Sequence, residues 1–584
     1  MGLLLPTIET CADASSSNFV GSLIHLLITS TEVYKETHRD TFDHYSLAPG
    51  LSWLATKALP LSTGVINHAP QGGQAKVQKG MCDLQQFRIR HVKCDEQKPE
   101  CDQCIRSGRK CDGYSDSSQR ELRENIKKDT PRHAWQINSD QRLVLVPGSR
   151  EERQYVHVFC TQATHALSGF FPSDFWTRFL PQLSQRYPAI RHAVSAVGAV
   201  YGKQLLPANS DPAEVEQFTL QQYNKAIQSF IGQMNTPQTV DIDLVLVTCL
   251  LFICLETLQS KNIRALDHIQ SGVQILAARS QEKKITMDNE FDRELLHTFS
   301  RLNIQTCLFG RGIQPLDIQP EKSTFAESHD KFAFDNIAQA RETLTSLQNR
   351  ALVFIRSVGS RSGVTYESVY EQHVKQQQAM LAEYYTWRAA FDRLRKRSTK
   401  TAGISDLRAP LALLIEYHVS LVWLLNCITQ QESNFDNFTS HFEEIVHTAE
   451  DILELSPETD STPVAEQFSL DPGVLAHIYW TAHKCRDPLI RRRAIAALAR
   501  CPARQGMWLR PLIVQVAYKI VEIEEEPLCY LPVEERKVAE KGRVYEALIY
   551  PEQDAQRSPC PVEFWLAPDP VSGDFERIRV DVTW

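Results

Sequence analysis

Four of the 15 cysteines lie within an 18-residue segment and are spaced as metal ligands would be. The order is Cys94-x6-Cys101-x2-Cys104-x6-Cys111, in a short polar stretch. Four thiolates brought together in this way suit Zn²⁺, which prefers tetrahedral sulfur coordination and whose binding contributes directly to folding. A redox-active CxxC pair is the alternative, but that motif follows a buried strand, and the residues around Pro99 offer none. The spacing therefore predicts a zinc site.

Basic side chains precede the first of these cysteines. Arg88, Arg90, His91 and Lys93 lie between residues 84 and 94, and no acidic residue interrupts them. The net charge of the whole chain is −8, so contact with DNA has to come from a local patch such as this one. A short helix here would present a positive face to phosphates and base edges. A solvated charged turn is the simpler interpretation, although a bound metal would fix the direction in which these side chains point.

The stretch FRIRHVKCDEQKPECDQCIRSGRKCDGY resembles the fungal Zn2Cys6 binuclear-cluster family of transcription factors. The family pattern is C-x2-C-x6-C, a loop that usually contains proline, and a second C-x2-C-x6-C. Cys94, Cys101, Cys104 and Cys111 match the last four ligands, and Pro99 lies in the loop. The resemblance implies that six cysteines hold two zinc ions, with two of the sulfurs bridging the ions.

The same resemblance implies roles for the basic residues. Lys93, directly before the first matched cysteine, would contact a CGG-type triplet in the major groove. Arg88 and Arg90 would lie on the DNA backbone or at the groove edge. His91 stands where the family often has Arg or Lys, so this contact departs from the family pattern.

The first half of the family pattern is broken. Leu84 and Phe87 occupy the positions of its first two cysteines, and eleven residues separate Cys82 from Cys94 where the family has nine. With Cys82 included, five candidate sulfurs are present. Either the chain has lost a ligand pair, or an exon boundary upstream of Arg88 is misplaced. We favour the second explanation because the pattern begins abruptly rather than decaying gradually.

The chain divides into five predicted segments. Residues 1–81 show no sustained helical or strand periodicity and are expected to be poorly ordered or the product of a wrong gene model. Residues 82–114 form the cysteine module. Residues 115–150 are polar and form a linker without a heptad repeat, which leaves a homodimer open. Residues 151–560 form a helical regulatory domain, and 561–584 form a β-hairpin tail. The predicted fold class is therefore mainly α.

Hydrophobic periodicity supports the helical assignment. One stripe with steps of three and four residues consists of Leu220, Tyr223, Ile227, Phe230 and Met234. Similar patterns recur at 410–427 and 508–523. The longest apolar run, 244–255, has 12 residues, fewer than the roughly 20 of a membrane span, and predicts a buried core helix.

The hydrophobic periodicity changes from a helical to an alternating pattern at the end of the chain. Ile578, Val580 and Val582 alternate with charged residues, as in a half-buried strand. Together with residues 562–567 and the turn-rich PDPVSGD that follows them, this pattern predicts a closing hairpin.

Several stretches of the body resemble the regulatory region of the same family, the fungal-specific transcription factor domain. They are LSGFFPSDFWTRFLPQL, YPAIRHAVSAVGAVYG, FTLQQYNKAIQSFI, LVTCLLFICLETLQ, ALDHIQSGVQILAAR and SRLNIQTCLFG. The resemblance implies an all-α regulatory domain that responds to partners or metabolites. From the residues alone, Trp176, Phe252 and Phe309 are expected to be packing residues. The cysteines of the body, among them Cys249, Cys254 and Cys307, are expected to be buried thiols.

Enzyme signatures are missing from the sequence. It contains no GxSxG, GxxxxGK[ST], GxGxxG or HExxH motif. In HFEEIVH, His441 and His447 are six residues apart and so lie on different helix faces, unlike a zinc-binding i, i+4 pair. An acidic run at 522–526 is expected to be a solvated face rather than a site for basic partners. No enzyme is predicted.

These observations predict a nuclear, zinc-dependent, sequence-specific transcription factor that acts on RNA polymerase II transcription of metabolic genes, foremost a secondary-metabolite cluster. Its partners would be DNA and the transcription machinery or coregulators, with no membrane. The alternative is a regulator with a degenerate zinc module that acts through protein partners without binding DNA.

Overall fold

The computed structural model describes most of the chain after residue 146. The described residues are 147–203, 212–234, 241–282, 290–309, 316, 333–359, 366–398, 407–429, 431–455, 468–470, 473–549, 558–566 and 575–584. The predicted segments 1–81, 82–114 and most of 115–150 lie outside them.

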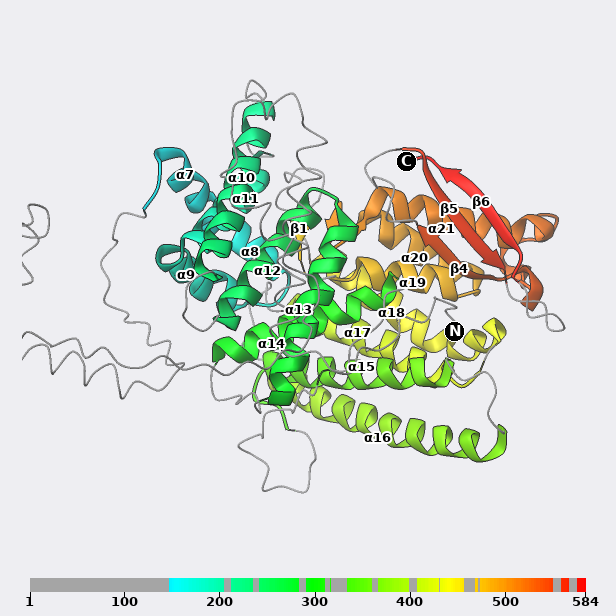
Figure 1. Cartoon of the computed structure of the whole chain (residues 1–584). Coiled ribbons are helices and arrows are strands. Elements are labelled where there is room, and N and C mark those ends of the chain that lie inside the picture. The colour runs from blue at the N-terminus through cyan, green and yellow to red at the C-terminus, as the bar shows by residue number, and fades with distance from the viewer. Residues whose placement is uncertain are drawn as a thin grey trace, which may run out of the picture. The chain divides into compact units, whose positions relative to one another are not determined.

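The described part is predominantly helical (Figure 1). Its first helices are α7 (Arg150–Val158), α8 (Thr164–Ser168), α9 (Leu180–Arg186), α10 (Pro188–Lys203), α11 (Pro212–Met234), α12 (Ile242–Leu258), α13 (Asn262–Glu282) and α14 (Glu290–Leu308). The later helices are α15 (Ile337–Gly359), α16 (Tyr366–Ser398), α17 (Arg408–Asn426), the 3-10 helix η4 (Glu432–Phe438), α18 (Thr439–Glu454), α19 (Leu475–Lys484), α20 (Pro488–Arg500) and α21 (Arg510–Glu525). This arrangement confirms the predicted fold class.

Helix α12 contains the long apolar run and is buried on all sides. Every residue from Asp243 to Thr257 is buried, which confirms the predicted core helix. It begins at Asp241, whose side chain accepts a hydrogen bond from the backbone N–H of Asp243 at 3.2 Å. Helices α10 and α13 pack against it, so the apolar surface is covered by other helices rather than by solvent.

The predicted stripe of α11 also faces the core. Leu220, Tyr223, Ile227 and Phe230 are buried, as the three-and-four spacing requires. The ring of Tyr223 meets that of Phe252 in α12 edge to face, with centroids 4.8 Å apart. Trp176 and Phe252 are buried and Phe309 packs against the core, so these three residues are packing residues, as expected.

Helices α15–α21 surround a second apolar core in which α17 is central. By length and composition α17 could cross a membrane, but 72% of its apolar window is buried inside the protein, as in a core helix. Trp387 of α16 stacks on Tyr417 of α17 with ring centroids 5.4 Å apart, and its Nε1 donates to the Ala340 carbonyl of α15 at 2.9 Å. Aromatic stacking and one hydrogen bond thus join α15 and α16 to α17.

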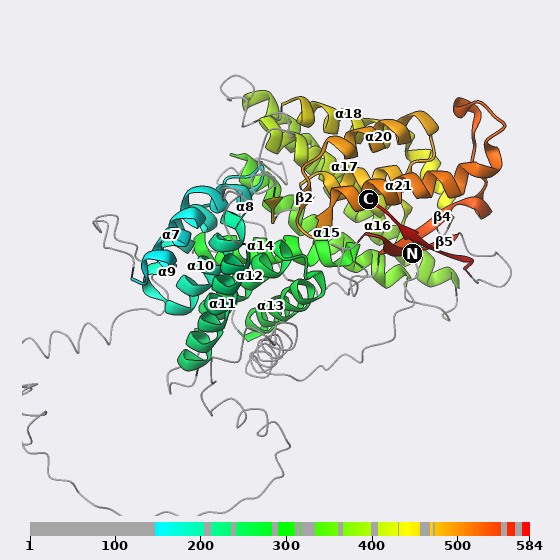
Figure 2. The same cartoon turned by 90° about the horizontal axis from the view of Figure 1, so that it is seen from above.

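A three-stranded antiparallel sheet closes the chain. It consists of β4 (Val544–Ile549), β5 (Cys560–Leu566) and β6 (Arg577–Val582), in that order. The predicted hairpin is confirmed as β5–β6, in which Val562 lies opposite Val580. Strand β4, which pairs with β5 and contacts α21, was not predicted. Figures 1 and 2 show this sheet at one end of the described body and α7–α11 at the other.

A second, very short sheet connects the helices around α12 with those around α17. It contains β1 (Phe468–Ser469), β2 (Arg504–Gln505) and β3 (Trp508–Leu509). From β2, Arg504 donates to the Thr257 carbonyl at the end of α12. The side-chain oxygen of Gln505 accepts the backbone N–H groups of Val474 and Leu475 at 3.0 and 2.8 Å, so the start of α19 is held by the same sheet.

Helices α7 and α10 meet where α10 has a glycine. A Cβ atom at Gly198 would lie far inside van der Waals contact with the Tyr155 carbonyl oxygen of α7. Backbone cannot move aside as a flexible side chain can, so only glycine allows this approach.

We expect Gly198→Ala to lower the free energy of unfolding by about 1–3 kcal/mol, because the added methyl group overpacks this crossing. The matched control is Gly232→Ala in α11, where no atom lies within 4 Å of the new Cβ. That change should stabilise by roughly 0.5–1 kcal/mol through helix propensity alone. Thermal unfolding followed by circular dichroism measures both, and equal shifts for the two variants would contradict the close approach.

Candidate DNA-binding module and the charged core of the helical body

The predicted site residues lie outside the described part of the chain. They are the cysteines Cys82, Cys94, Cys101, Cys104 and Cys111 and the basic residues Arg88, Arg90, His91 and Lys93. Their roles therefore remain predictions from the sequence. Among the residues that the structure does describe, no group of three or more His, Cys, Asp or Glu side chains is placed to hold a metal ion.

Five of the nine free cysteines in the described residues are buried. Cys249 and Cys254 are buried in α12, as predicted, whereas Cys307 of α14 is only partly buried, contrary to expectation. Burial raises the pKa of Cys249 to about 12, so this thiol stays protonated and is a poor ligand or nucleophile at neutral pH. Cys529 is exposed.

The acidic run at the end of α21 is only partly the solvated face that was expected, since Glu522 and Glu526 are exposed but Glu524 and Glu525 are not. Glu524 and Glu525 are buried, whereas the Glu522 side chain is 61% exposed and pairs with Lys519 at 2.8 Å. Glu525 pairs with Arg492 at 2.6 Å and Arg536 at 3.2 Å. The expectation was wrong for these two carboxylates because their partners lie elsewhere in the sequence, where helical periodicity gives no sign of them.

A buried charge cluster forms around Arg486, in the short connection between α19 and α20. Its Nη2 lies 2.9 Å from Oε1 of Glu524, and its Nη1 lies 3.0 Å from Oε2 of Glu432. Arg491 of α20 pairs with the second oxygen of Glu524, and Lys484 pairs with the second oxygen of Glu432 at 3.0 Å. Two carboxylates and three cations thus alternate inside the protein.

The cluster also anchors the first strand of the C-terminal sheet. The backbone N–H of Val544 donates to Glu524 at 2.7 Å, and Arg486 donates to the Val544 carbonyl at 2.9 Å. Burial alone would raise the pKa of Glu524, but Arg486 and Arg491 lower it below its usual value. The carboxylate is therefore ionised in the folded protein, as its hydrogen bonds require.

His441 of the HFEEIVH stretch has a structural partner. Its Nδ1 lies 2.9 Å from Nδ1 of His418 in α17, and Arg388 of α16 lies 3.1 Å from the other ring nitrogen of His418. Burial, Arg388 and His441 lower the pKa of His418 to about 3. The neutral ring is a contact between helices, while His447 is exposed and pairs with Asp451 at 3.4 Å. The two histidines of the stretch do not face each other, as the six-residue spacing predicted.

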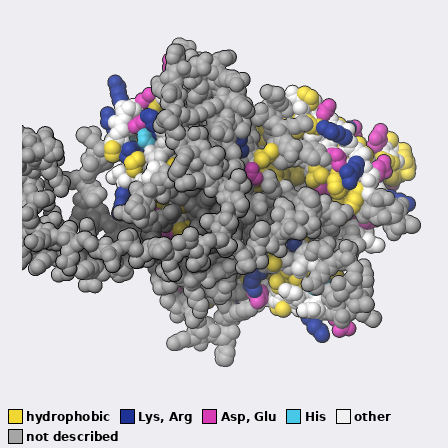
Figure 3. Space-filling view, viewed as in Figure 1, with side chains coloured by type: hydrophobic (Ala, Val, Ile, Leu, Met, Phe, Trp, Pro, Cys, Tyr) yellow, Lys and Arg dark blue, Asp and Glu magenta, His cyan; other side chains and the backbone are white. Residues whose placement is uncertain are grey.

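On the described part of the face in Figure 3, basic, acidic and apolar side chains are intermixed. No single sign of charge gathers there. The basic segment before Cys94 therefore differs from this face in its charge pattern.

We expect Glu524→Gln to lower the free energy of unfolding by about 3–5 kcal/mol, because Arg491 and Arg486 would remain buried with one carboxylate fewer, and Glu432 alone would face Arg486 and Lys484. Glu522→Gln on the same helix is the control and should change stability by less than about 0.5 kcal/mol. Urea unfolding measures both changes. Two small changes of similar size would show that the buried cluster does not stabilise the body.

Comparison with known proteins identifies the cysteine segment. Residues 85–121 match the model of the fungal Zn(2)-Cys(6) binuclear cluster domain. The match includes Cys94, Cys101, Cys104 and Cys111, the basic residues from Arg88 to Lys93, and begins after Cys82. The matched domain is one that binds zinc.

Two relatives extend the similarity beyond this segment. The Aspercryptin biosynthesis cluster-specific transcription regulator atnN of Emericella nidulans is 22% identical, over 75% of this chain and 86% of the relative. The transcription regulator lscL of Purpureocillium lilacinum is 27% identical over 32% of this chain and 47% of the relative. Both are named as regulators of transcription and neither as an enzyme. The chain therefore contains a fungal Zn2Cys6 binuclear cluster domain at residues 85–121 and is similar over three quarters of its length to a fungal regulator of transcription.

Proposed function

We propose that the protein is a zinc-dependent activator or repressor that binds specific DNA sequences in the nucleus and controls RNA polymerase II transcription of a secondary-metabolite biosynthetic gene cluster. The match to the zinc-cluster domain at residues 85–121 carries the proposal. The choice of target genes rests on atnN, which is named as specific for the aspercryptin biosynthesis cluster.

The donor set of the segment fits zinc. Cys94, Cys101, Cys104 and Cys111 supply four soft sulfur ligands, which as thiolates suit Zn²⁺ better than Mg²⁺ or Ca²⁺. Bound zinc would hold the short polar segment in one conformation, since this segment has little apolar surface to bury. Cys82 is a further candidate, although it precedes the matched residues.

Recognition of DNA would come from the basic residues beside the metal site. Lys93 is assigned to a CGG-type triplet, and Arg88 and Arg90 to the backbone or groove edge. Between residues 84 and 111 there are seven Lys or Arg and four Asp or Glu, so this module is positive although the whole chain is negative. A local positive module on an acidic chain can bind DNA while the rest of the protein avoids it.

The helical body is proposed to control the module through coregulators or the transcription machinery. The linker has no heptad repeat that would indicate a coiled-coil dimer. The proposal therefore includes both a monomer and a homodimer. The absence of the first CxxC favours one second candidate, a regulator that has lost DNA binding and acts through protein partners alone. The first CxxC is absent either because the chain has lost it or because an exon boundary is misplaced. The 5′ sequence of the messenger RNA distinguishes these explanations, because a CxxC encoded directly before FRIRHVKC would restore all six ligands.

Zinc content tests the metal site. We expect Cys101→Ala to release the bound zinc, whereas Cys529→Ala, which removes the exposed thiol of the body, should leave the zinc content unchanged. Elemental analysis of the purified chain gives the number of ions. About two ions per chain would need ligands beyond those in this sequence, one or none supports a reduced module, and unchanged zinc in Cys101→Ala would contradict the assignment.

DNA binding tests the function itself. The full chain should prefer a duplex with CGG triplets over a scrambled duplex, with an affinity that falls as salt rises. Lys93→Ala should weaken specific binding roughly 10-fold or more, as expected for loss of a base contact worth about 1–3 kcal/mol. Lys537→Ala, an exposed lysine of the body, should leave it unchanged. If fluorescence anisotropy shows no preference for CGG duplexes, the protein-interaction regulator is the better account.

A further inference from the structure

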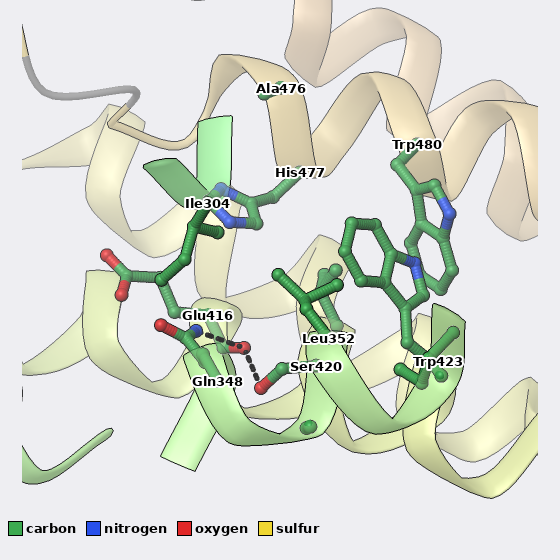
Figure 4. A pocket seen from close by; sticks show the side chains of 12 residues that line it. Ile304, Gln348, Leu352, Glu416, Ser420, Trp423, Ala476, His477 and Trp480 are labelled. Carbon is green, nitrogen blue, oxygen red and sulfur yellow. Dashed lines mark hydrogen bonds between the residues drawn. The ribbon is translucent and has the colours of Figure 1, made fainter. Parts of the chain in front are cut away.

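A cavity lies inside the helical body, where four helices meet. Residues of α14, α15, α17 and α19 line it, and it contains about 470 Å³ of empty space, including the part open to solvent. Figure 4 shows His477 and Gln348 at one end and Trp423 and Trp480 at the other, with Leu352 between them. The cavity therefore has a polar end and an aromatic end.

His477 presents a hydrogen-bond acceptor at the polar end. Its Nδ1 lies 3.1 Å from the Gly473 carbonyl oxygen. A carbonyl can only accept, so Nδ1 carries the proton and Nε2 keeps a lone pair that can accept. Nε2 makes no hydrogen bond within the described part of the chain. Burial lowers the pKa of His477 to about 4, so the ring is neutral near pH 7 and Nε2 remains an acceptor.

The donors near His477 bond within the protein. The Ser420 hydroxyl donates to the backbone carbonyl of Glu416 at 2.7 Å, and the side-chain amide of Gln348 donates to the same carbonyl at 3.5 Å. The side-chain oxygen of Gln348 is therefore a second acceptor at this end. Neither Lys nor Arg lines the cavity. An anion would find no cation here, and a ligand that only accepts would compete with the Glu416 carbonyl for the donors.

The other end is aromatic. The rings of Trp423 and Trp480 meet nearly at right angles, with an interplanar angle of 74° and centroids 5.8 Å apart. Phe435 and Phe442 also pack on Trp480, with centroids 6.0 and 5.7 Å from it. These neighbours hold Trp480 in place, so the tryptophan pair provides a fixed apolar wall against which a planar ring can pack.

We propose that this cavity binds a small neutral phenol, whose hydroxyl group donates to Nε2 of His477 and whose ring packs against Trp423 and Trp480. A buried acceptor without a donor costs free energy, so a ligand that supplies a donor is preferred over one of the same shape that does not. An apolar cavity with a few polar groups at one end fixes the orientation of such a ligand. This inference goes beyond the proposed function and does not depend on DNA binding.

The test uses the full chain and three probes that share an ethylphenyl group: 4-ethylphenol, 1-ethyl-4-fluorobenzene and 4-ethylbenzoate. Fluorine takes the place of the hydroxyl group at similar size but cannot donate, and the benzoate carries a negative charge. Saturation-transfer NMR titrations at pH 7 give the dissociation constants. We expect 4-ethylphenol to bind with a Kd of about 1 mM or tighter, as its size allows. The fluoro compound should bind about 10-fold more weakly, and the benzoate should not bind measurably.

Two variants locate the binding in the cavity. In His477→Asn, the side-chain N–H can still donate to the Gly473 carbonyl, but the acceptor Nε2 is lost. This change should weaken 4-ethylphenol about 10-fold and leave the fluoro compound unchanged. His447→Asn is the matched control, because the His447 side chain is 66% exposed on α18. Trp423→Phe reduces the aromatic wall without leaving a hydrogen-bond partner unsatisfied, and should weaken both compounds.

Three results would overturn the proposal. One is that 4-ethylphenol does not bind at millimolar concentration, which would make the cavity a structural space only. The second is that the fluoro compound or the benzoate binds as tightly as the phenol. The third is that His477→Asn and Trp423→Phe, both folded by thermal unfolding, leave the phenol affinity unchanged, which would place the phenol elsewhere on the protein. The first two results need only the unchanged chain, so they decide the question even if a variant does not fold.

Discussion

Arg486 is held between two buried carboxylates, Glu432 and Glu524, at 3.0 and 2.9 Å, and much of the C-terminal half depends on this arrangement. Glu432 lies in η4, Glu524 near the end of α21, and Arg486 between α19 and α20. A buried charge without its partner is strongly destabilising, so these segments cannot shift separately. The backbone of Val544 joins the same cluster, which fixes where the C-terminal sheet begins.

Apolar packing supplies the remaining framework. Helix α12 is buried from Asp243 to Thr257, and α17 has the same role in the second core. Charge and packing act together here, because the ion pairs hold the ends of helices whose middles are held by side-chain contacts. A cavity lies where α14, α15, α17 and α19 meet.

The zinc-cluster segment and the helical body are stabilised in different ways. The basic, cysteine-rich segment at 85–121 needs little apolar surface, because metal binding can replace a hydrophobic core in so short a stretch. The body, by contrast, buries large apolar surfaces and keeps its cysteines as thiols. The proposed zinc ligands and the buried thiols are thus separated along the chain, and the positive charge is local to one segment of an acidic chain.

The sequence by itself determined the features that depend on neighbouring residues. The spacing of Cys94, Cys101, Cys104 and Cys111 indicated the family, and periodicity predicted the helices and the β5–β6 hairpin. Only the tertiary structure decided the environment of the acidic run of α21, because Arg486, one of the partners of Glu524, is 38 residues away. Strand β4 and the cavity between α14, α15, α17 and α19 were also decided only by the tertiary structure. Periodicity shows which face of a helix is buried, but not which distant segment meets it, and pairing between distant segments depends on the packing of the whole body.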